Sequence, residues 1–511
     1  MCNRSRTASI HILDDDSLIH IFYLYRPFLL GEDEDNLDNG ARRFWGGSRG
    51  WVRGRWWYGL AHVCRRWRNI ILGSASYLEL SLVCTFGTPV QDMLAHSPHL
   101  PLAVDYHENG REITTDDEEG IIFALKQRER VLRVRLRVPV TGLQKFNAAM
   151  NDEYPILEFL VIELPPEDKS TILKFPETFQ APRLRHLNLI GFALPIGCQL
   201  LTAAVSLVTL SLHMVHPSTY FQPNTLLQWI SFMPQLEMIS IVFEFSIPSR
   251  DVKRQLKHTP IIAHVTLPNL HHFEFRGIPS YLEALVHRMT TPRLERLLIG
   301  FFNQLTFSVP RLLQFINAAE NLRFGSAKFR FFSNGVVVTV YPREEAAMPV
   351  FGLNVFCWHL DWQVSSMAQI INSLSQAFHA VEHLTLKHEE HFQSSEEHDE
   401  VSRTEWRRLL RPFNNVKTLR IDNGILEELS RCLQSEGGEH PLEVLPELQE
   451  LTCYGSGNIG DGFASFADAR RNAGRPITSV RDSSNQHSSK PSFDASTITP
   501  ADSEDGNTFG T

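Results

Sequence analysis

The chain has 511 residues, of which 43% are hydrophobic and 21% charged, and its formal net charge is −9. An apolar share of this size supports a large folded core, and the moderate acidic charge argues against general nucleic-acid binding. No segment reaches the roughly 20 apolar residues of a membrane span, and no signal-peptide core is present. The seven cysteines are scattered without a Cys-x-x-Cys pair, so a location inside the cell, in the cytoplasm or nucleus, is expected.

The first structured region is predicted at 11–78, as a helical module that follows a flexible N-terminus at 1–10. A helix is predicted over 13–25, because Asp14 can accept hydrogen bonds from the free N–H groups at its start. Apolar residues recur at helical spacing on one face, namely Leu18, Ile21, Phe22 and Tyr25. Ile19 lies on another face. Either a partner completes the packing of this module, or its helices cap the region that follows.

A second helix is predicted over 59–72, with Gly73 as its C-terminal stop. Its apolar face carries Leu60, Val63, Cys64, Trp67 and Ile71. A long insert at about 31–57 separates the two helices, and its RRFWGGSRGWVRGRWW stretch holds five arginines and five aromatic residues. Such a mixture can bind single-stranded RNA. The preferred interpretation is a surface loop whose terminal tryptophans anchor the second helix.

Residues 79–455 carry a repeated strand pattern. A core of the form Leu-x-x-Leu-x-Leu, with conservative replacements, recurs from Val131/Val134/Leu136 to Leu448/Leu451/Cys453. Between 131 and 294 its first positions are separated by 26, 27, 23, 29, 34 and 24 residues. This period is typical of leucine-rich repeats, in which each unit supplies one strand and one helix. Between Leu322 and Val381 no copy can be placed securely.

Amphipathic helices are predicted between the strands, at 224–233, 280–289, 310–320, 365–378, 402–411 and 424–434. The predicted fold class is therefore α/β: helices at the N-terminus, then an irregular leucine-rich-repeat solenoid with a parallel sheet. An ordinary α/β domain is the alternative, but its buried strands would be continuous apolar runs, and here polar residues interrupt each copy. Residues 456–511 have few large apolar side chains and are predicted to be a disordered tail.

The stretches LDDDSLIHIF and LAHVCRRWRNIILGSASYLELSLVCTFGTPVQDML resemble the F-box of a large family of proteins from mushroom-type (basidiomycete) fungi. The resemblance implies a substrate receptor that binds a Skp1-type adaptor, and through it a cullin-based ubiquitin ligase, without catalysing a reaction itself. By the same resemblance, the positions that pack within the module or against the adaptor are Leu13, Asp15, Leu18, Ile19, Ile21, Phe22, Val63, Cys64 and Trp67. The family's usual proline is replaced by Asp14 and the insert is long. A repeat scaffold that has lost adaptor binding is therefore the second hypothesis.

The strand pattern also predicts a target-binding face. In a parallel solenoid, the variable positions that alternate with the buried ones point to the concave side. Seven of them are basic or histidine and two are acidic, on a chain that is acidic overall. The seven are Arg133, Arg135, His186, His272, Arg296, His383 and Arg420. They predict an acidic or phosphorylated target segment, which arginine can pair bidentately. Ordinary variation of a strand surface is the alternative.

No cofactor, metal or catalytic residue is expected. Four histidines lie within an acidic run, namely His383, His388, His391 and His398, but they lack the spacing of a metal site. A solvated acidic loop is the preferred interpretation. Phosphate-binding glycine loops and a nucleophile elbow are also absent from the sequence, which favours a protein that binds rather than one that catalyses.

Overall fold

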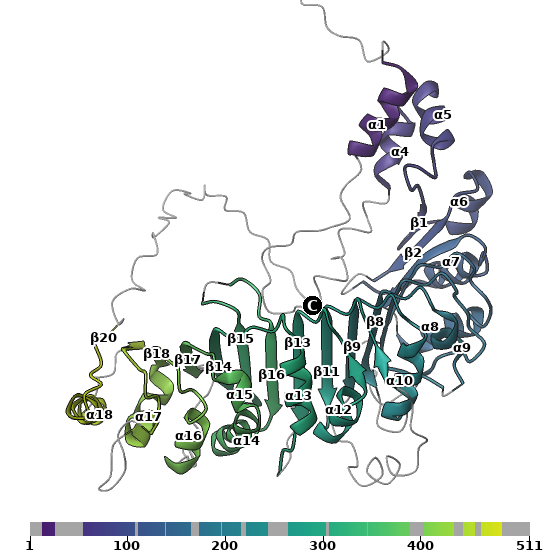
Figure 1. Cartoon of the computed structure of the whole chain (residues 1–511). Coiled ribbons are helices and arrows are strands. Elements are labelled where there is room, and N and C mark those ends of the chain that lie inside the picture. Colours follow the sequence, from purple (N-terminus) through teal and green to yellow (C-terminus); the bar gives the residue numbers. More distant parts are fainter. Residues whose placement is uncertain are drawn as a thin grey trace, which may run out of the picture.

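A computed structural model describes residues 13–25, 55–107, 111–137, 139–164, 173–195, 197–215, 221–243, 264–302, 306–344, 346–388, 403–433, 443–454 and 461–482. These residues form a small helical module and a long curved sheet (Figure 1). The helices of the sheet region lie along its outer side, and the module stands away from one end of the sheet (Figure 1). We call the sheet face turned away from the helices the concave face.

In the described residues the large sheet has sixteen strands. The N-terminal part, in spatial order, consists of β1 (Leu82–Cys84), β2 (Leu102–Tyr106), β3 (Val131–Arg137), β4 (Phe159–Glu163), β6 (His186–Ile190), β8 (Thr209–Val215), β9 (Met238–Phe243), β11 (His272–Gly277) and β13 (Arg296–Phe302). The C-terminal part continues with β16 (Phe351–Phe356), β15 (Gly335–Tyr341), β14 (Ser326–Phe332), β17 (His383–His388), β18 (Thr418–Asp422), β19 (Glu450–Tyr454) and β20 (Ser479–Asp482). Neighbouring strands are parallel except at β15, which is antiparallel to β14 and β16.

Helices alternate with the strands along the chain. They are α6 (Val90–His96), α7 (Thr115–Leu125), α8 (Val140–Ala149), α9 (Gln199–Ala203), α10 (Pro223–Ser231), α12 (Pro279–Val286), α13 (Pro310–Ala318), α14 (Leu360–Ser373), α15 (Ser375–Phe378), α16 (Arg403–Leu410), the 3₁₀ turn η5 (Asn423–Ile425), α17 (Leu426–Leu433) and α18 (Asp461–Asn472). Two short parallel pairs complete the region, β5 (Leu173–Lys174) with β7 (Phe192–Ala193), and β10 (Val265–Thr266) with β12 (Met289–Thr290). All six predicted helices are present, and the predicted solenoid-like α/β fold is confirmed.

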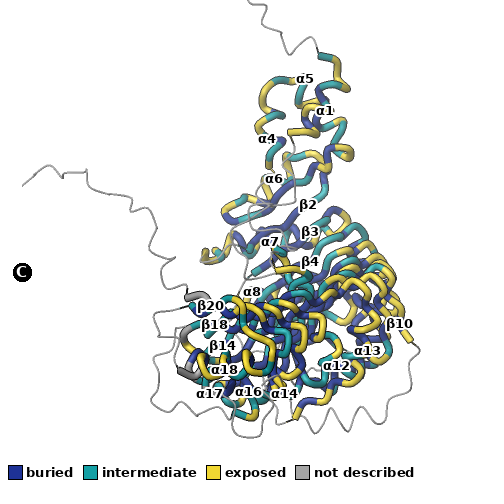
Figure 2. Tube along the Cα trace, turned by 60° about the vertical axis from the view of Figure 1, so that its left-hand side comes forward, coloured by how far each residue is buried: buried dark blue, intermediate teal, exposed yellow. Residues whose placement is uncertain are grey.

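The leucine positions of each repeat explain why this fold forms. In the β6 copy, Leu184, Leu187 and Leu189 are buried against the helices, while His186 and Asn188 point to the concave face. Figure 2 shows the strands as a buried layer with exposed residues on the outer helices. One apolar cluster runs from the N-terminal module to α18. Because each repeat buries its apolar side only against its neighbours, the core is built by stacking.

The region between Leu322 and Val381 departs from the repeat. From α13 the chain enters β14, reverses into β15 and reverses again into β16, which pairs with β13. The β14–β15 register runs from Ser326–Tyr341 to Phe332–Gly335. A hairpin with period-two alternation therefore replaces the expected strand-and-helix unit, which is why no leucine repeat could be placed there.

The tail prediction was wrong for residues 461–482, which form α18 and β20. Phe463 and Phe466 of α18 are buried. Arg470 is fully buried and donates hydrogen bonds to the carbonyl oxygens of Leu445, Pro446 and Leu448, at 3.0, 2.9 and 3.1 Å. The solenoid thus extends one repeat beyond the predicted end at residue 455. Residues 1–10 and 483–511 lie outside the described residues.

Candidate protein-binding surfaces

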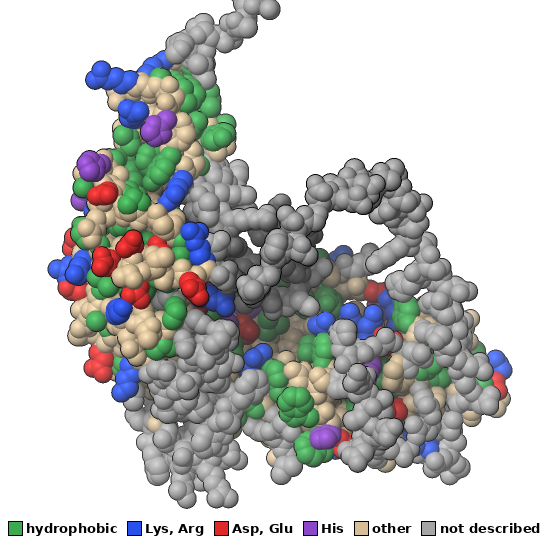
Figure 3. All heavy atoms as spheres, turned by 180° about the vertical axis from the view of Figure 1, so that it is seen from behind, with side chains coloured by type: hydrophobic (Ala, Val, Ile, Leu, Met, Phe, Trp, Pro, Cys, Tyr) green, Lys and Arg blue, Asp and Glu red, His purple; other side chains and the backbone are tan. Residues whose placement is uncertain are grey.

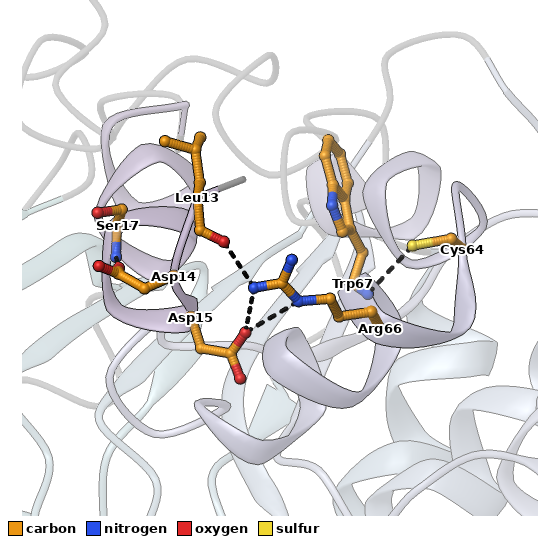
Figure 4. A network of polar contacts seen from close by, with 7 residues as sticks. All are labelled: Leu13, Asp14, Asp15, Ser17, Cys64, Arg66 and Trp67. Carbon is orange, nitrogen blue, oxygen red and sulfur yellow. Dashed lines mark hydrogen bonds and ion pairs between the residues drawn. The ribbon is translucent and has the colours of Figure 1, made fainter. Parts of the chain in front are cut away.

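The N-terminal module consists of α1 (Asp15–Tyr25), α4 (Trp56–Ala61) and α5 (Arg65–Gly73). Asp14 caps α1, as predicted, since its Oδ1 accepts a hydrogen bond from the Ser17 N–H at 2.7 Å. This bond lowers the pKa of the Asp14 carboxyl. The Arg66 guanidinium then links α5 to the start of α1 (Figure 4), with Nη2 donating to the Leu13 carbonyl and to Asp15 Oδ1, both at 2.7 Å. Because this ion pair is exposed, it contributes about 1 kcal/mol or less.

The second predicted helix is broken, which corrects the prediction for 59–72. α4 ends at Ala61, and Cys64 adopts extended backbone and accepts the Trp67 N–H on its thiol at 3.5 Å. Cys64 is therefore the cap of a separate helix, α5 (Figure 4). Val63 lies in the turn between α4 and α5 and is 59% exposed, rather than on a buried helix face.

An aromatic contact closes the interior of the module. The rings of Phe22 and Trp67 meet edge to face with centroids 5.0 Å apart. Leu18, Phe22 and Ile71 are almost fully buried. Among the residues expected to contact an adaptor, Leu18 and Phe22 thus serve the module's own packing, whereas Ile21 and Val63 face outward. The half-buried members of that set are Leu13, Ile19, Cys64 and Trp67.

Exposed apolar side chains are concentrated on this module. Of the eleven large hydrophobic residues that are exposed in the described chain, six belong to the module and its exit: Ile21, Tyr23, Leu24, Tyr25, Val63 and Tyr77. Tyr23, Leu24, Tyr25 and Tyr77 are additional to the predicted site. Tyr23 and Tyr77 are in ring contact at 5.3 Å. We call these six residues the apolar tip. Several large apolar groups exposed on one small module are typical of an interaction site.

The module is joined to the solenoid by polar contacts from α4 and from Arg55, the residue that precedes it. Arg55 Nη2 donates to the Val83 carbonyl at 3.3 Å and to Thr88 Oγ1 at 2.9 Å. Trp57 is buried, and its Nε1 donates to the Ser81 carbonyl at 3.3 Å. Trp57, a tryptophan at the end of the insert, thus holds α4 against the residues that precede β1, and the surface-loop interpretation of the insert stays a prediction. The rest of the insert lies outside the described residues.

The second surface is the concave face, where the variable positions of neighbouring strands are register partners. One row across seven strands reads Arg133, Phe159, His186, Thr209, Met238, His272 and Arg296. Farther along the sheet, His383 pairs with Thr418, and Arg420 pairs with Thr385. The fold thus places the predicted target-binding residues on one face, but spreads them over its whole length.

Two of the predicted basic positions are neutral. Burial, together with the positive charges of Arg185 and Arg133, lowers the pKa of His186 to about 4. Burial and Arg296 likewise lower the pKa of His272 to about 4. His186 Nδ1 lies 3.0 Å from Thr209 Oγ1. These histidines therefore act as uncharged polar groups at neutral pH. The prediction that they add positive charge to the target-binding face was wrong.

Charge is compensated at the N-terminal end of the concave face. Arg135 is buried and has Asp105 as its register partner on β2. Burial lowers the pKa of Arg135, and the carboxylates of Asp105 and Glu163 oppose that effect. Glu163 also lies 2.9 Å from His107 Nε2. This end of the face consequently offers little uncompensated positive charge.

A hollow of about 800 Å³ lies in the C-terminal half of the concave face, between β11 and β19. Six cationic side chains line it, with two carboxylates against them. The cations are Arg276, Arg296, Lys328, Arg330, Lys387 and Arg420, and the carboxylates are Glu274 and Glu344. Figure 3 shows Lys and Arg side chains gathered on this side of the molecule. We call this site the basic hollow.

Small residues form the floor of the basic hollow. Gly300 and Gly352 occupy concave-face positions on β13 and β16. A Cβ atom at Gly352 would lie 2.7 Å from Leu298 Cδ2, and one at Gly300 would lie 3.1 Å from Arg276 Cγ. The Leu298 and Arg276 side chains therefore lie over these glycines, and a larger residue at either position would have to displace them. The segment 346–349, which follows the β15 strand, contributes to the wall.

The cations are positioned by aromatic rings and by one internal carboxylate. The Arg276 guanidinium carbon lies 4.5 Å from the Phe356 ring centroid, and Lys387 Nζ lies 5.9 Å from that of Tyr454. Glu344 pairs with Arg420, and its Oε2 lies 3.4 Å from His383 Nδ1. The predicted residues Arg296 and Arg420 therefore belong to the hollow, with His383 at its rim.

A chain of hydrogen bonds fixes Glu274 at the other side. Ser240 Oγ donates to Glu274 Oε2 at 2.6 Å and lies 2.6 Å from His213 Nε2. Since the single hydroxyl proton goes to Glu274, the histidine is the donor to Ser240. Ser240 is fully buried, so this arrangement orients a carboxylate rather than presenting a serine nucleophile.

Four cations of the hollow were missed by the sequence reasoning. Two of them, Arg276 and Lys387, occupy the next concave-face position after the Leu-x-x-Leu-x-Leu core of their repeats. The other two, Lys328 and Arg330, lie on β14, where no repeat was placed. The stretch SAKFRFF at 326–332 alternates polar and apolar residues. That alternation is a strand signal and could have identified both residues.

Comparison with known proteins adds little to this description. No family model matches the chain, and no curated protein matches it. A solved structure, the leucine-rich repeat-containing protein LegL7 from Legionella pneumophila, is similar at 11% identity over 78% of this chain and 98% of its own, with a TM-score of 0.26. The helices that the structure describes include none with the length and apolar character to cross a bilayer. The described residues hold no cluster of three His, Cys, Asp or Glu side chains suited to a metal, and His391 and His398 lie outside them.

Proposed function

We propose that this chain is a substrate receptor that binds two proteins, an adaptor through its N-terminal module and a target through the concave face of its solenoid. In the finer form of the proposal, the adaptor is of the Skp1 type and links the target to a cullin-based ubiquitin ligase inside the cell. The observation that carries the proposal is the apolar tip, which holds six of the eleven exposed large hydrophobic residues of the described chain.

The construction of the module supports this role. Its interior is already closed by Leu18, Phe22 and Ile71, so the exposed Ile21 and Leu24, at 42% and 64%, are not needed for its own packing. Apolar side chains exposed at this level gain about 25 cal/mol for each Å² that a partner covers. Asp14 stands where the F-box family usually has proline, and it still caps the N-terminus of α1 by accepting the Ser17 N–H.

Adaptor capture tests the proposal. The full chain is mixed with a recombinant Skp1-type adaptor and compared with an Ile21→Asp, Leu24→Asp variant, which should fold because both side chains are exposed. A matched control carries Val205→Asp and Trp358→Asp, which alter exposed apolar residues of the solenoid. Capture by the wild type and the control, but not by the tip variant, is the expected result. Absence of capture by the wild type would favour the repeat scaffold that lacks an adaptor.

A further inference from the structure

The basic hollow has a charge opposite to that of the whole protein. Its six cations and two carboxylates leave four positive charges in excess, whereas the chain carries −9 overall. A recessed surface with one sign of charge concentrates the electric field and raises the local concentration of counter-charged ligands. The hollow is therefore a site for an anionic group.

The strand register gives this site two poles. One row of partners runs Arg276, Gly300, Asn354, Val337, Arg330 and Lys387 across six neighbouring strands. Arg276 is four strand steps from Arg330, which at about 4.8 Å per step separates them by about 19 Å. Arg330 and Lys387 lie on adjacent strands and form the second pole. A single small anion cannot reach both.

The middle of the row differs from its ends. Gly300 has no side chain, and the Arg276 side chain lies over it. The buried Oδ1 of Asn354 accepts no hydrogen bond from the described residues. A buried acceptor without a donor is costly unless a ligand supplies one. Peptide N–H groups are such donors. An extended peptide rises about 3.4 Å per residue, so about six residues span the distance between the poles.

We propose that the basic hollow binds an extended segment of a target protein with anionic side chains about six residues apart, one at Arg276 and one at Arg330 and Lys387. The anionic groups are carboxylates or phosphomonoesters, both of which pair with arginine in the same way. Glu344 shows that a carboxylate is accommodated in the hollow, since it pairs with Arg420. This inference deepens the proposed function, because it names the kind of target that the receptor would recruit.

Fluorescence anisotropy with labelled peptides of about ten residues tests it. The first peptide has two glutamate pairs separated by neutral residues, the second has phosphoserine in their place, and the third has all four glutamates at one end. Oligo-uridine RNA is the fourth probe. We expect the first or second peptide to bind the full chain at least about tenfold more tightly than the third peptide and the RNA. Which of the two binds better distinguishes carboxylates from phosphomonoesters.

Charge-reversal variants test whether the peptide binds at the basic hollow. Arg276→Glu and Arg330→Glu should each weaken peptide binding about tenfold or more, whereas Arg183→Glu with Arg293→Glu, which alter exposed arginines outside the hollow, should not. Arg276→Gln checks the result without reversing charge. Binding of the clustered peptide or RNA as tightly as the spaced peptides, or no binding at all, would overturn the inference. Adaptor capture is measured on the same preparations, so the proposed function can stand while this inference fails.

Discussion

Arg330 of β14 and Lys387 of β17 are register partners on adjacent parallel strands, so two basic residues occupy neighbouring positions on the concave face. Like charges placed in this way destabilise a sheet. A local arrangement that opposes folding is expected where function requires it. Such a pair is what a functional surface would retain, and the binding experiments above test whether the basic hollow is one.

The repulsion can be measured by a double-mutant cycle with Arg330→Gln, Lys387→Gln and both together. We expect an unfavourable coupling of about 0.5 kcal/mol between the wild-type residues in urea unfolding. It should shrink in high salt, because ions screen partly exposed charges. A favourable coupling, or one that salt leaves unchanged, would show that the pair is not under electrostatic strain.

Loss of the α1 cap should loosen the N-terminal module. Asp14→Ala removes the acceptor of the Ser17 N–H, and we expect faster amide hydrogen exchange in the first turn of α1 and weaker adaptor capture. Asp14→Ser, which keeps a side-chain acceptor, is the matched control. Equal exchange rates in the Ala and Ser variants would mean that the cap does not hold the helix.

Removal of the buried arginine of α18 should destabilise the C-terminal end of the solenoid. Arg470→Met leaves the carbonyl groups of Leu445, Pro446 and Leu448 without this donor. The expected cost is about 2 to 4 kcal/mol in urea unfolding. The exposed Arg471→Met serves as control. If both variants unfold at the same urea concentration as the wild type, residues 461–482 are not part of the cooperative fold.

Acid should weaken the protein through its buried histidines. Because the pKa values of His186 and His272 are lowered to about 4, the unfolded chain binds protons below its ordinary histidine pKa of about 6.5 and the folded chain does not. Stability is therefore fully present above pH 6.5 and is lost as the pH falls toward 4.

His272→Gln should reduce the slope of this loss between pH 6.5 and 4, in urea unfolding measured across that range. The exposed His287→Gln is the control and should keep the wild-type slope. A slope that His272→Gln leaves unchanged would show that His272 titrates alike in both states.

The repeat period was sufficient to predict the sheet, because burial of leucines such as Leu187 and Leu189 against the helices depends on local spacing alone. The β14–β15 hairpin could not be predicted in this way, since its pairing depends on which strand lies next to β13 and not on a repeat. The α18 signal was present in the spacing of Phe463, Phe466 and Arg470, but the polar composition around it obscured it.

The candidate site residues likewise include some that the sequence could predict and some that it could not. Register placed Arg296 and Arg420 on the concave face as expected from the sequence. The charge state of His186 and His272 depends on burial by neighbouring strands, which one repeat does not reveal. The turn at 62–64 was missed because Val63 fits an apolar helix face, and only the backbone of Cys64 shows that the helix is interrupted there.

Simultaneous binding of both partners tests the central claim most directly. The anisotropy of the labelled spaced peptide is measured with the full chain alone and with the chain saturated by the Skp1-type adaptor. We predict the same dissociation constant in both titrations and a larger final anisotropy with the adaptor, because one chain then holds both partners on separate surfaces. Displacement of the peptide by the adaptor, or failure of the adaptor to join the complex, would contradict the account.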